Sequence, residues 1–148
     1  MLLYYLDLQQ NPAFFECEYR RFGQGEHHIT RKWEKSVLLL MLKNELYFEE
    51  DGKAVSVREN TWYIQRGGLQ QKGPKGSPAP EYFYIHCDGT FKEAPYLGGG
   101  LLPTEGQFSR DIVLPLIREL YACQNGIETA GKYENTIFRY LLYELKKE

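Results

Sequence analysis

The sequence contains few of the residues on which common catalytic and metal sites depend. Its 148 residues include only three cysteines and three histidines. Cys17, Cys87 and Cys123 lie far apart and form no CxxC pair, which predicts reduced thiols and not a disulfide framework. No HxH pair occurs either, so a metal centre with about three converging protein ligands is not expected.

Familiar enzyme signatures are also missing. The sequence holds no GxSxG nucleophile motif, no phosphate-binding P-loop, no GxGxxG fingerprint after a strand and no HExxH zinc motif. We therefore expect no catalytic residues, no cofactor and no enzyme activity, although a carboxylate-rich site stays open.

Charge of one sign and long hydrophobic runs are absent as well. The formal net charge is −2, so a nucleic-acid surface on this segment is not expected. The longest apolar run, residues 37–42, is far shorter than the ~20 residues that span a membrane. Residues 1–8 have no basic start and do not form a signal peptide. These features predict a cytoplasmic protein with no membrane partner.

Short apolar or alternating segments between turn signals organise residues 29–87. Asp51-Gly52 is a strong hairpin signal between two alternating segments, and Gly67-Gly68 marks a further break. This spacing predicts a mainly β fold, a sandwich or closed barrel. The expected strands are residues 13–22, 37–42, 45–49, 53–57, 62–65 and 82–87.

The flanking segments are less regular. Residues 1–12 read as an edge strand or as an arm laid over the domain, and the Gly- and Pro-rich residues 72–80 as a surface loop. The β pattern fades after Phe91. Residues 108–114 are the last expected extended segment, ending at Pro115.

Two helices are expected at the C-terminal end. Pro115 suits the first position of a helix over residues 115–124, which Asn125-Gly126 would end. A second helix is expected over residues 130–147, with apolar residues at a spacing of 3.6. These helices cover either the sheet or a second subunit. The apolar stripe comprises Tyr133, Ile137, Phe138, Leu141, Leu142 and Leu145.

The best candidate for a binding surface is the aromatic strand over residues 82–87. Tyr82, Tyr84 and His86 alternate along it and therefore share one face, while the other face is apolar. If the polar face points inward, it lines a cavity suited to a small polar ligand. If it points outward, the interior is an ordinary apolar core. The sequence leaves both orientations open.

Arg31 and Trp33 are a second candidate pair. On an extended chain they face the same side, where Arg offers a planar fork of donors and Trp a flat stacking surface. The alternative is a rim arginine stacked on the indole. His27-His28 point to opposite faces of an extended chain, which favours exposed loop histidines over a shared metal.

Residues 29–91 resemble the N-terminal, cupin-like effector-binding and dimerisation domain of AraC-type transcriptional regulators. The resemblance rests on Arg31 ahead of an apolar strand, on LYFEEDGKAVSV over residues 46–57, on a hydrophobic step before Gly67-Gly68, and on an aromatic strand that reaches His86. Two departures stand out. Gln70 occupies the place of a family histidine, and the family's helix-turn-helix region is not in this sequence.

This resemblance implies a cupin-like jelly-roll barrel over residues 1–106 and a C-terminal strand and helical dimerisation region over 107–148, within one structural domain. It implies a small effector, in this family often a sugar, and DNA contact only through the missing helix-turn-helix domain. The chain is then a piece of a longer regulator or a one-domain relative. The implied ligand residues are Arg31, Gln70, Lys72, Tyr82 and Tyr84, to which the residue patterns add Trp33 and His86. The expected homodimer contact on the last helix comprises Ile137, Leu141 and Leu145.

Two other functions remain open. The chain could instead be a cupin enzyme, a sugar isomerase or epimerase that uses His86 and a tyrosine as acid and base. It could also be a ligand-free dimerisation module, whose filled barrel would have no cavity.

Overall fold

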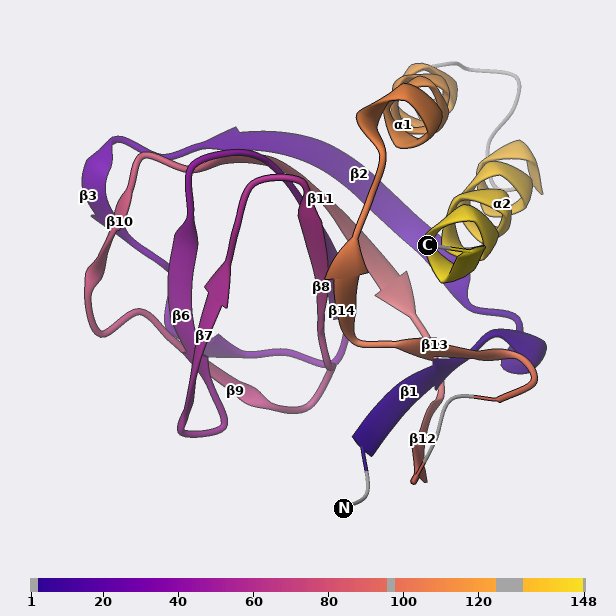
Figure 1. The fold of residues 1–148 in the computed structure, drawn as a ribbon, viewed down its shortest axis with the longest axis horizontal. Coiled ribbons are helices and arrows are strands. Elements are labelled where there is room, and N and C mark those ends of the chain that lie inside the picture. Colours follow the sequence, from indigo (N-terminus) through magenta and orange to yellow (C-terminus); the bar gives the residue numbers. More distant parts are fainter. Residues whose placement is uncertain (1–2, 96–97, 125–131, 148) are drawn as a thin grey trace.

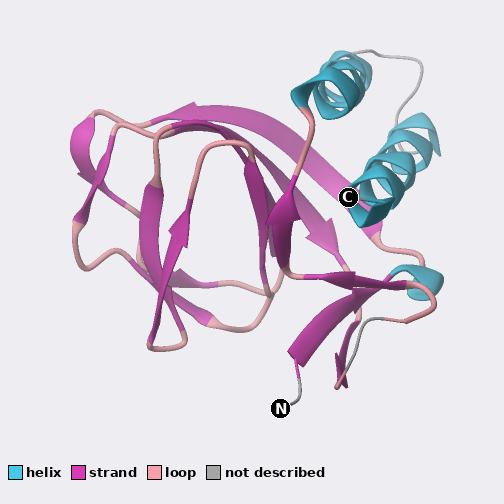
Figure 2. Cartoon of the chain, in the orientation of Figure 1, coloured by secondary structure: helices cyan, strands magenta, loops and turns pink. Residues whose placement is uncertain are grey.

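The computed structural model describes residues 3–95, 98–124 and 132–147. The chain is mainly β and has two helices at its C-terminal end, as expected (Figures 1 and 2). The strands are β1 (Leu3–Asp7), β2 (Ala13–Arg21), β3 (Gln24–His27), β4 (Arg31–Lys32), β5 (Ser36–Lys43), β6 (Leu46–Glu50), β7 (Lys53–Val57), β8 (Thr61–Gln65), β9 (Gln70–Lys72), β10 (Gly76–Pro78), β11 (Glu81–Asp88), β12 (Phe91–Ala94), β13 (Leu101–Pro103) and β14 (Glu105–Gln107). The helices are the short 3-10 helix η1 (Leu8–Gln10), α1 (Arg110–Gln124) and α2 (Lys132–Lys147).

Two antiparallel sheets form the main body. One has the order β14-β8-β5-β11-β2 and the other the order β4-β9-β6-β7. Asp51 and Gly52 both have positive φ angles and join β6 to β7 through a two-residue turn, as the sequence predicts. The strands expected over residues 13–87 are all present, with boundaries within a few residues of the predicted ones.

The apolar run at residues 37–42 lies in β5, the middle strand of the five-stranded sheet. Leu38 and Leu40 belong to one hydrophobic cluster, whereas Val37, Leu39 and Met41 belong to another on the opposite face. Both faces of β5 are therefore covered, which explains why its sequence is continuously apolar and does not alternate.

None of the sheets closes into a barrel within the described residues. The edge strands of the five-stranded sheet are β14 and β2, and those of the four-stranded sheet are β4 and β7. The expectation of a closed barrel is therefore not met. The mainly β character is confirmed, and the jelly-roll assignment stays a prediction.

Residues 1–12 do not form an edge strand or a loose arm. β1 is the central strand of a third sheet, paired with β12 on one side and β13 on the other. Leu6 is only 1% exposed, so this strand contributes to the core. The expectation failed because the partner strands lie in the Gly- and Pro-rich region after Phe91, where sequence alternation is weak. β9 and β10 were also not predicted, because sequence alternation is weak there too. They lie at or within residues 72–80, which were expected to form a loop.

Helix α1 begins earlier than the sequence predicts. It starts at Arg110, so residues 110–114 are helical and Pro115 lies inside the helix. Proline removes the backbone donor that would reach the carbonyl of Asp111. The buried residues Val113, Ile117 and Leu120 nevertheless follow a helical spacing, and all are fully buried. Packing of this stripe outweighs the proline.

Helix α2 buries every residue of its apolar stripe except Tyr133 inside the chain. Ile137, Leu141 and Leu145 are 8%, 0% and 2% exposed, so they do not form the free surface expected for a dimer contact. Tyr133, the first residue of the predicted apolar stripe, is instead 49% exposed. The exposed side of α2 carries Tyr133, Tyr140 and Tyr143. The predicted residues before 132 lie outside the described part of this helix.

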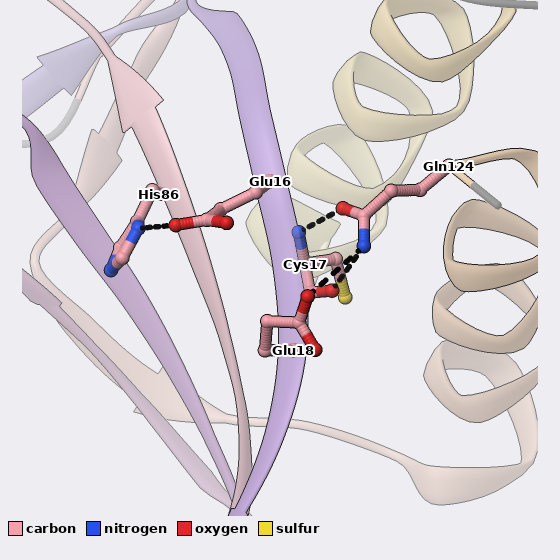
Figure 3. A network of polar contacts seen from close by, with 5 residues as sticks. All are labelled: Glu16, Cys17, Glu18, His86 and Gln124. Carbon is pink, nitrogen blue, oxygen red and sulfur yellow. Dashed lines mark hydrogen bonds and ion pairs between the residues drawn. The ribbon is translucent and has the colours of Figure 1, made fainter.

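Both helices lie along β2, the edge strand of the five-stranded sheet (Figure 1). The side-chain amide of Gln124 accepts from the Cys17 N–H at 2.6 Å and donates to the Cys17 carbonyl at 2.9 Å (Figure 3). Asn135 of α2 accepts from the Phe14 N–H at 2.7 Å. These side chains replace a neighbouring strand and satisfy an edge that would otherwise be open.

Candidate functional site

A cavity of about 220 Å³ lies on the inner face of the five-stranded sheet. Its volume corresponds to roughly seven water molecules and is below the usual range for pockets that hold drug-sized ligands. The cavity is therefore of a size for one small molecule. Its walls are formed by Arg20, Phe22, His27, His28, Ile29, Arg31, Val37, Leu39, Gln65, Tyr82, Tyr84 and His86.

The register of the sheet explains which side chains reach this cavity. Tyr84 pairs with Leu39 of β5 and Glu18 of β2, and paired residues share a face of a sheet. His86 likewise pairs with Val37 and Glu16. The polar face of β11 therefore points to the cavity.

The apolar face of β11 points the other way. Ile85 and Cys87 belong to the core cluster that also contains the buried residues of α1 and α2, and Phe83 packs against it. The structure thus answers the question that the sequence left open, because the helices cover the apolar face.

His86 is held by a carboxylate from the neighbouring strand. Its Nδ1 lies 2.6 Å from Oε1 of Glu16 (Figure 3). Its ring also meets the Trp33 ring edge-on, with centroids 4.6 Å apart. Burial lowers the pKa of His86, against the opposing effect of Glu16. A neutral imidazole with Nδ1–H donating to Glu16 leaves Nε2 as an acceptor.

His28 belongs to a second polar network. Its Nδ1 lies 2.6 Å from the Ile29 carbonyl, and its Nε2 lies 3.0 Å from Nε2 of Gln65. Burial lowers the pKa of His28. These partners fit a neutral ring that donates from Nδ1 and accepts the Gln65 amide hydrogen at Nε2.

The network continues from the cavity wall toward the four-stranded sheet. Gln65 donates to Oε1 of Gln71 at 3.3 Å, and Gln71 donates to Oε2 of Glu50 at 2.9 Å. The Tyr63 hydroxyl donates to Oε1 of the same carboxylate at 2.7 Å. A chain of hydrogen bonds therefore fixes the orientation of Gln65.

The tyrosines offer neutral hydroxyls. Burial raises the pKa of Tyr82 and of Tyr84 above the ordinary value. Their rings lie 6.2 Å apart, and Tyr82 packs edge-on against Phe22 at 5.9 Å. Each hydroxyl can donate or accept, and each ring supplies an apolar surface.

Arg31 stacks on Trp33, with the guanidinium carbon 5.2 Å from the ring centroid. Arg31 lines the cavity, whereas Trp33 does not and packs behind Arg31 and His86. Trp33 thus positions other side chains, and its predicted stacking on a ligand stays a prediction.

Gln70 and Lys72 do not line the cavity. They alternate with Gln71 on β9, and it is Gln71 that is buried, at 4% exposure. Gln71 does not line the cavity either, but its side chain accepts a hydrogen bond from Gln65, which does.

Several wall residues were not predicted. Arg20, Phe22 and Gln65 carry no motif, and only the pairing of β2 and β8 with their neighbours brings them together. His28 was expected to be exposed but is 7% exposed and lines the cavity, whereas His27 is exposed. One sequence signal could have predicted the position of Arg20, namely its alternation with Glu16 and Glu18 on β2.

Within the described residues, no group of three or more His, Cys, Asp or Glu side chains could hold a metal ion. No helix of the same residues is long and apolar enough to cross a membrane.

No family model matches the chain. The chain is similar to an uncharacterised HTH-type transcriptional regulator, YisR, of Bacillus subtilis (strain 168), with 30% identity over 78 residues. The match covers 52% of this chain and 27% of that protein. The matched segment thus spans about a quarter of the length of that regulator.

Proposed function

We propose that the chain is the effector-sensing and dimerising domain of an AraC-type transcriptional regulator. In this proposal the cavity binds a small hydroxylated effector, such as a carbohydrate, and a helix-turn-helix domain outside this sequence contacts DNA. The observation that carries it is the cavity of about 220 Å³ whose wall combines Tyr82, Tyr84, His86 and Arg31. The similarity to a transcriptional regulator supports the regulatory half.

The chemistry of the wall supports a polar ligand. Hydroxyls, imidazole rings, guanidinium groups and an amide line the cavity beside Phe22, Val37 and Leu39. A sugar presents hydroxyls at its rim and C–H groups on its ring faces, so such a mixed wall satisfies both. A wholly apolar wall would have left those hydroxyls without partners.

Strand β2 offers a route from the cavity to the helices. Glu16 bonds to His86 on the cavity side, and Cys17 next to it is bonded through its backbone to Gln124 of α1 (Figure 3). A ligand that moves His86 would therefore act on the strand that anchors α1. Such coupling is what a sensing domain requires.

Dimerisation is part of the proposal, with a change in the contact residues. Because Ile137, Leu141 and Leu145 are buried in the chain, the contact is assigned to the exposed tyrosines of α2, Tyr140 and Tyr143. They are 54% and 58% exposed and lie three residues apart on one face. Sedimentation at micromolar concentration should give a dimer in wild type and a monomer in a Tyr140→Glu/Tyr143→Glu variant.

A thermal-shift screen against neutral sugars, sugar acids, sugar phosphates and small carboxylates tests the sensing function. A compound at a hundred times its dissociation constant should stabilise the fold by about 2.7 kcal/mol. That gain corresponds to a few degrees in a domain of this size. Stabilisation that is lost in Tyr84→Ala supports the cavity as the site. No stabilisation by any class of compound contradicts the proposal.

The His86–Glu16 pair favours one alternative, an isomerase or epimerase. A carboxylate that orients an imidazole is a common arrangement for a general base. That alternative predicts turnover of a bound sugar that disappears in His86→Ala, whereas the sensing function predicts binding without turnover. The ligand-free module is less well supported, because it predicts a filled interior.

A further inference from the structure

The wall of the cavity carries positive charge and no carboxylate. Arg20 and Arg31 line it together with three histidines, and none of the lining residues is Asp or Glu. A neutral sugar does not require this arrangement. The two arginines differ in their partners.

Arg20 is already neutralised. It forms an ion pair with Glu26, and its guanidinium carbon lies 4.9 Å from the centroid of Phe22. Its charge therefore has a partner on the same part of the chain.

Arg31 has no such partner. Within the described residues, its guanidinium makes no ion pair and no hydrogen bond, although it is half-buried and held over the Trp33 ring. Stacking on an aromatic ring fixes the plane of the guanidinium while leaving its N–H donors at the edge. A guanidinium with a fixed plane and unused N–H donors matches a carboxylate or phosphate, which can accept two parallel hydrogen bonds.

The neighbouring carboxylates have other partners. Glu16 accepts from His86, Glu26 pairs with Arg20, and Glu18 accepts from Gln124 at 3.3 Å. Glu16 and Glu18 belong to β2, and Glu26 belongs to β3. None lies within 4.0 Å of the Arg31 guanidinium nitrogens among the described ion pairs.

His86 supplies the complementary acceptor. With Nδ1–H directed to Glu16, its Nε2 can accept a hydrogen bond from a ligand hydroxyl. The hydroxyls of Tyr82 and Tyr84 add two groups that both donate and accept. The site thus combines one unpaired cation with several partners for hydroxyl groups.

We propose that the effector is a small hydroxylated oxyanion, whose carboxylate or phosphate binds the guanidinium of Arg31 and whose hydroxyl binds Nε2 of His86. This inference rests on the proposed sensing function and names its ligand class. The cavity volume limits the ligand to the size of a single sugar ring. A sugar acid and a sugar phosphate both have the required chemistry.

Isothermal titration of the full chain with matched probes tests this inference. The three sets are D-glucose and D-galactose, their 6-carboxylates (D-glucuronate and D-galacturonate), and their 6-phosphates. We expect at least one anionic probe to bind at least ~10-fold more tightly than its neutral parent. The carboxylate and phosphate arms then identify which oxyanion the site prefers.

Variants of Arg31 complete the test. Arg31→Gln removes the charge and should weaken the anionic probe by about 10- to 100-fold. Arg31→Lys keeps the charge but not the fork, so its loss should be intermediate. Lys32→Gln removes an exposed positive charge from the neighbouring residue on β4 and should leave affinity unchanged. Circular dichroism checks that each variant is folded.

The possible outcomes distinguish the oxyanion ligand class from the sensing function itself. Binding of a neutral sugar as tightly as its acid, or an unchanged affinity in Arg31→Gln, overturns the oxyanion class and leaves the sensing function standing. Absence of binding by all three sets overturns the inference, and a negative result in the wider screen described above also overturns the sensing function.

Discussion

The guanidinium carbon of Arg31 lies 5.2 Å from the centroid of the Trp33 ring. The same indole meets the His86 ring edge-on at 4.6 Å. One aromatic side chain outside the cavity thus supports two polar side chains that line it, from β4 and β11. The geometry of the site depends on this support as much as on the groups that would touch a ligand.

Trp33→Leu should therefore weaken binding of the effector although Trp33 does not line the cavity. A stacked arginine gains about 0.5–1 kcal/mol from the ring, so we expect a loss of about 2- to 5-fold in affinity. Titration calorimetry measures it, and Trp33→Phe, which keeps a ring, should recover part of the loss. Equal affinity in Trp33→Leu and wild type would contradict the supporting role.

The free energy of unfolding should fall as the pH is lowered from about 7.5 to 5.5. Burial lowers the pKa of His28 and of His86 in the folded chain. In the unfolded chain both titrate near ~6.5. Below that pH the unfolded chain binds protons that the folded chain does not, so stability is lost until the pH reaches the folded pKa values.

Thermal unfolding at a series of pH values measures this effect. A His28→Gln/His86→Gln variant should show a flatter dependence over the same window, whereas His27→Gln, at an exposed site, should resemble wild type. An identical slope in the double variant and in wild type would assign the pH dependence to other groups.

Gln124→Ala should destabilise the chain by about 1–3 kcal/mol. The variant leaves the backbone N–H and carbonyl of the buried Cys17 without the partners that Gln124 supplies at 2.6 and 2.9 Å. Denaturant unfolding gives the difference. Gln107→Ala removes an exposed glutamine and should change stability by less than ~0.5 kcal/mol. Similar values for the two variants would refute the anchoring of β2 by α1.

Gly73→Ala should disturb the cavity through the backbone. A Cβ atom at this position would lie 2.0 Å from the His28 carbonyl oxygen, so the chain would have to move there. We expect lower stability and weaker effector binding together. Gly23→Ala is the matched control, because a Cβ there meets nothing within 4 Å. Wild-type affinity in a folded Gly73→Ala variant would show that the His28 segment is not part of the site.

The fold was predictable wherever local sequence carried the signal. The Asp51-Gly52 hairpin and the run in β5 depend on turn chemistry and apolar content, and both were correct. The third sheet was missed because β1 pairs with β13 across about 95 residues, and no local pattern encodes that pairing. The predicted start of α1 at Pro115 was wrong, because tertiary packing outweighed the local preference of proline for the first position of a helix.

Local sequence likewise predicted only part of the candidate site. Alternation placed Tyr82, Tyr84 and His86 on one face, but only the three-dimensional contacts show which face the helices cover. The burial of Ile137, Leu141 and Leu145 was not predicted, because a broad apolar stripe does not reveal how much of it the chain itself buries. Ile137 and Leu141 pack in the core of the chain, and the exposed face of α2 carries tyrosines.

The central claim is that the effector binds between His28, Arg31 and the polar face of β11. Hydrogen–deuterium exchange of the full chain, with and without the tightest compound from the screen, tests its location most directly. The account predicts slower exchange in peptides covering residues 27–31 and 82–86, and little direct change in β1 and β12. Protection confined to the third sheet or to the outer face of α2, with residues 27–31 unchanged, would contradict it.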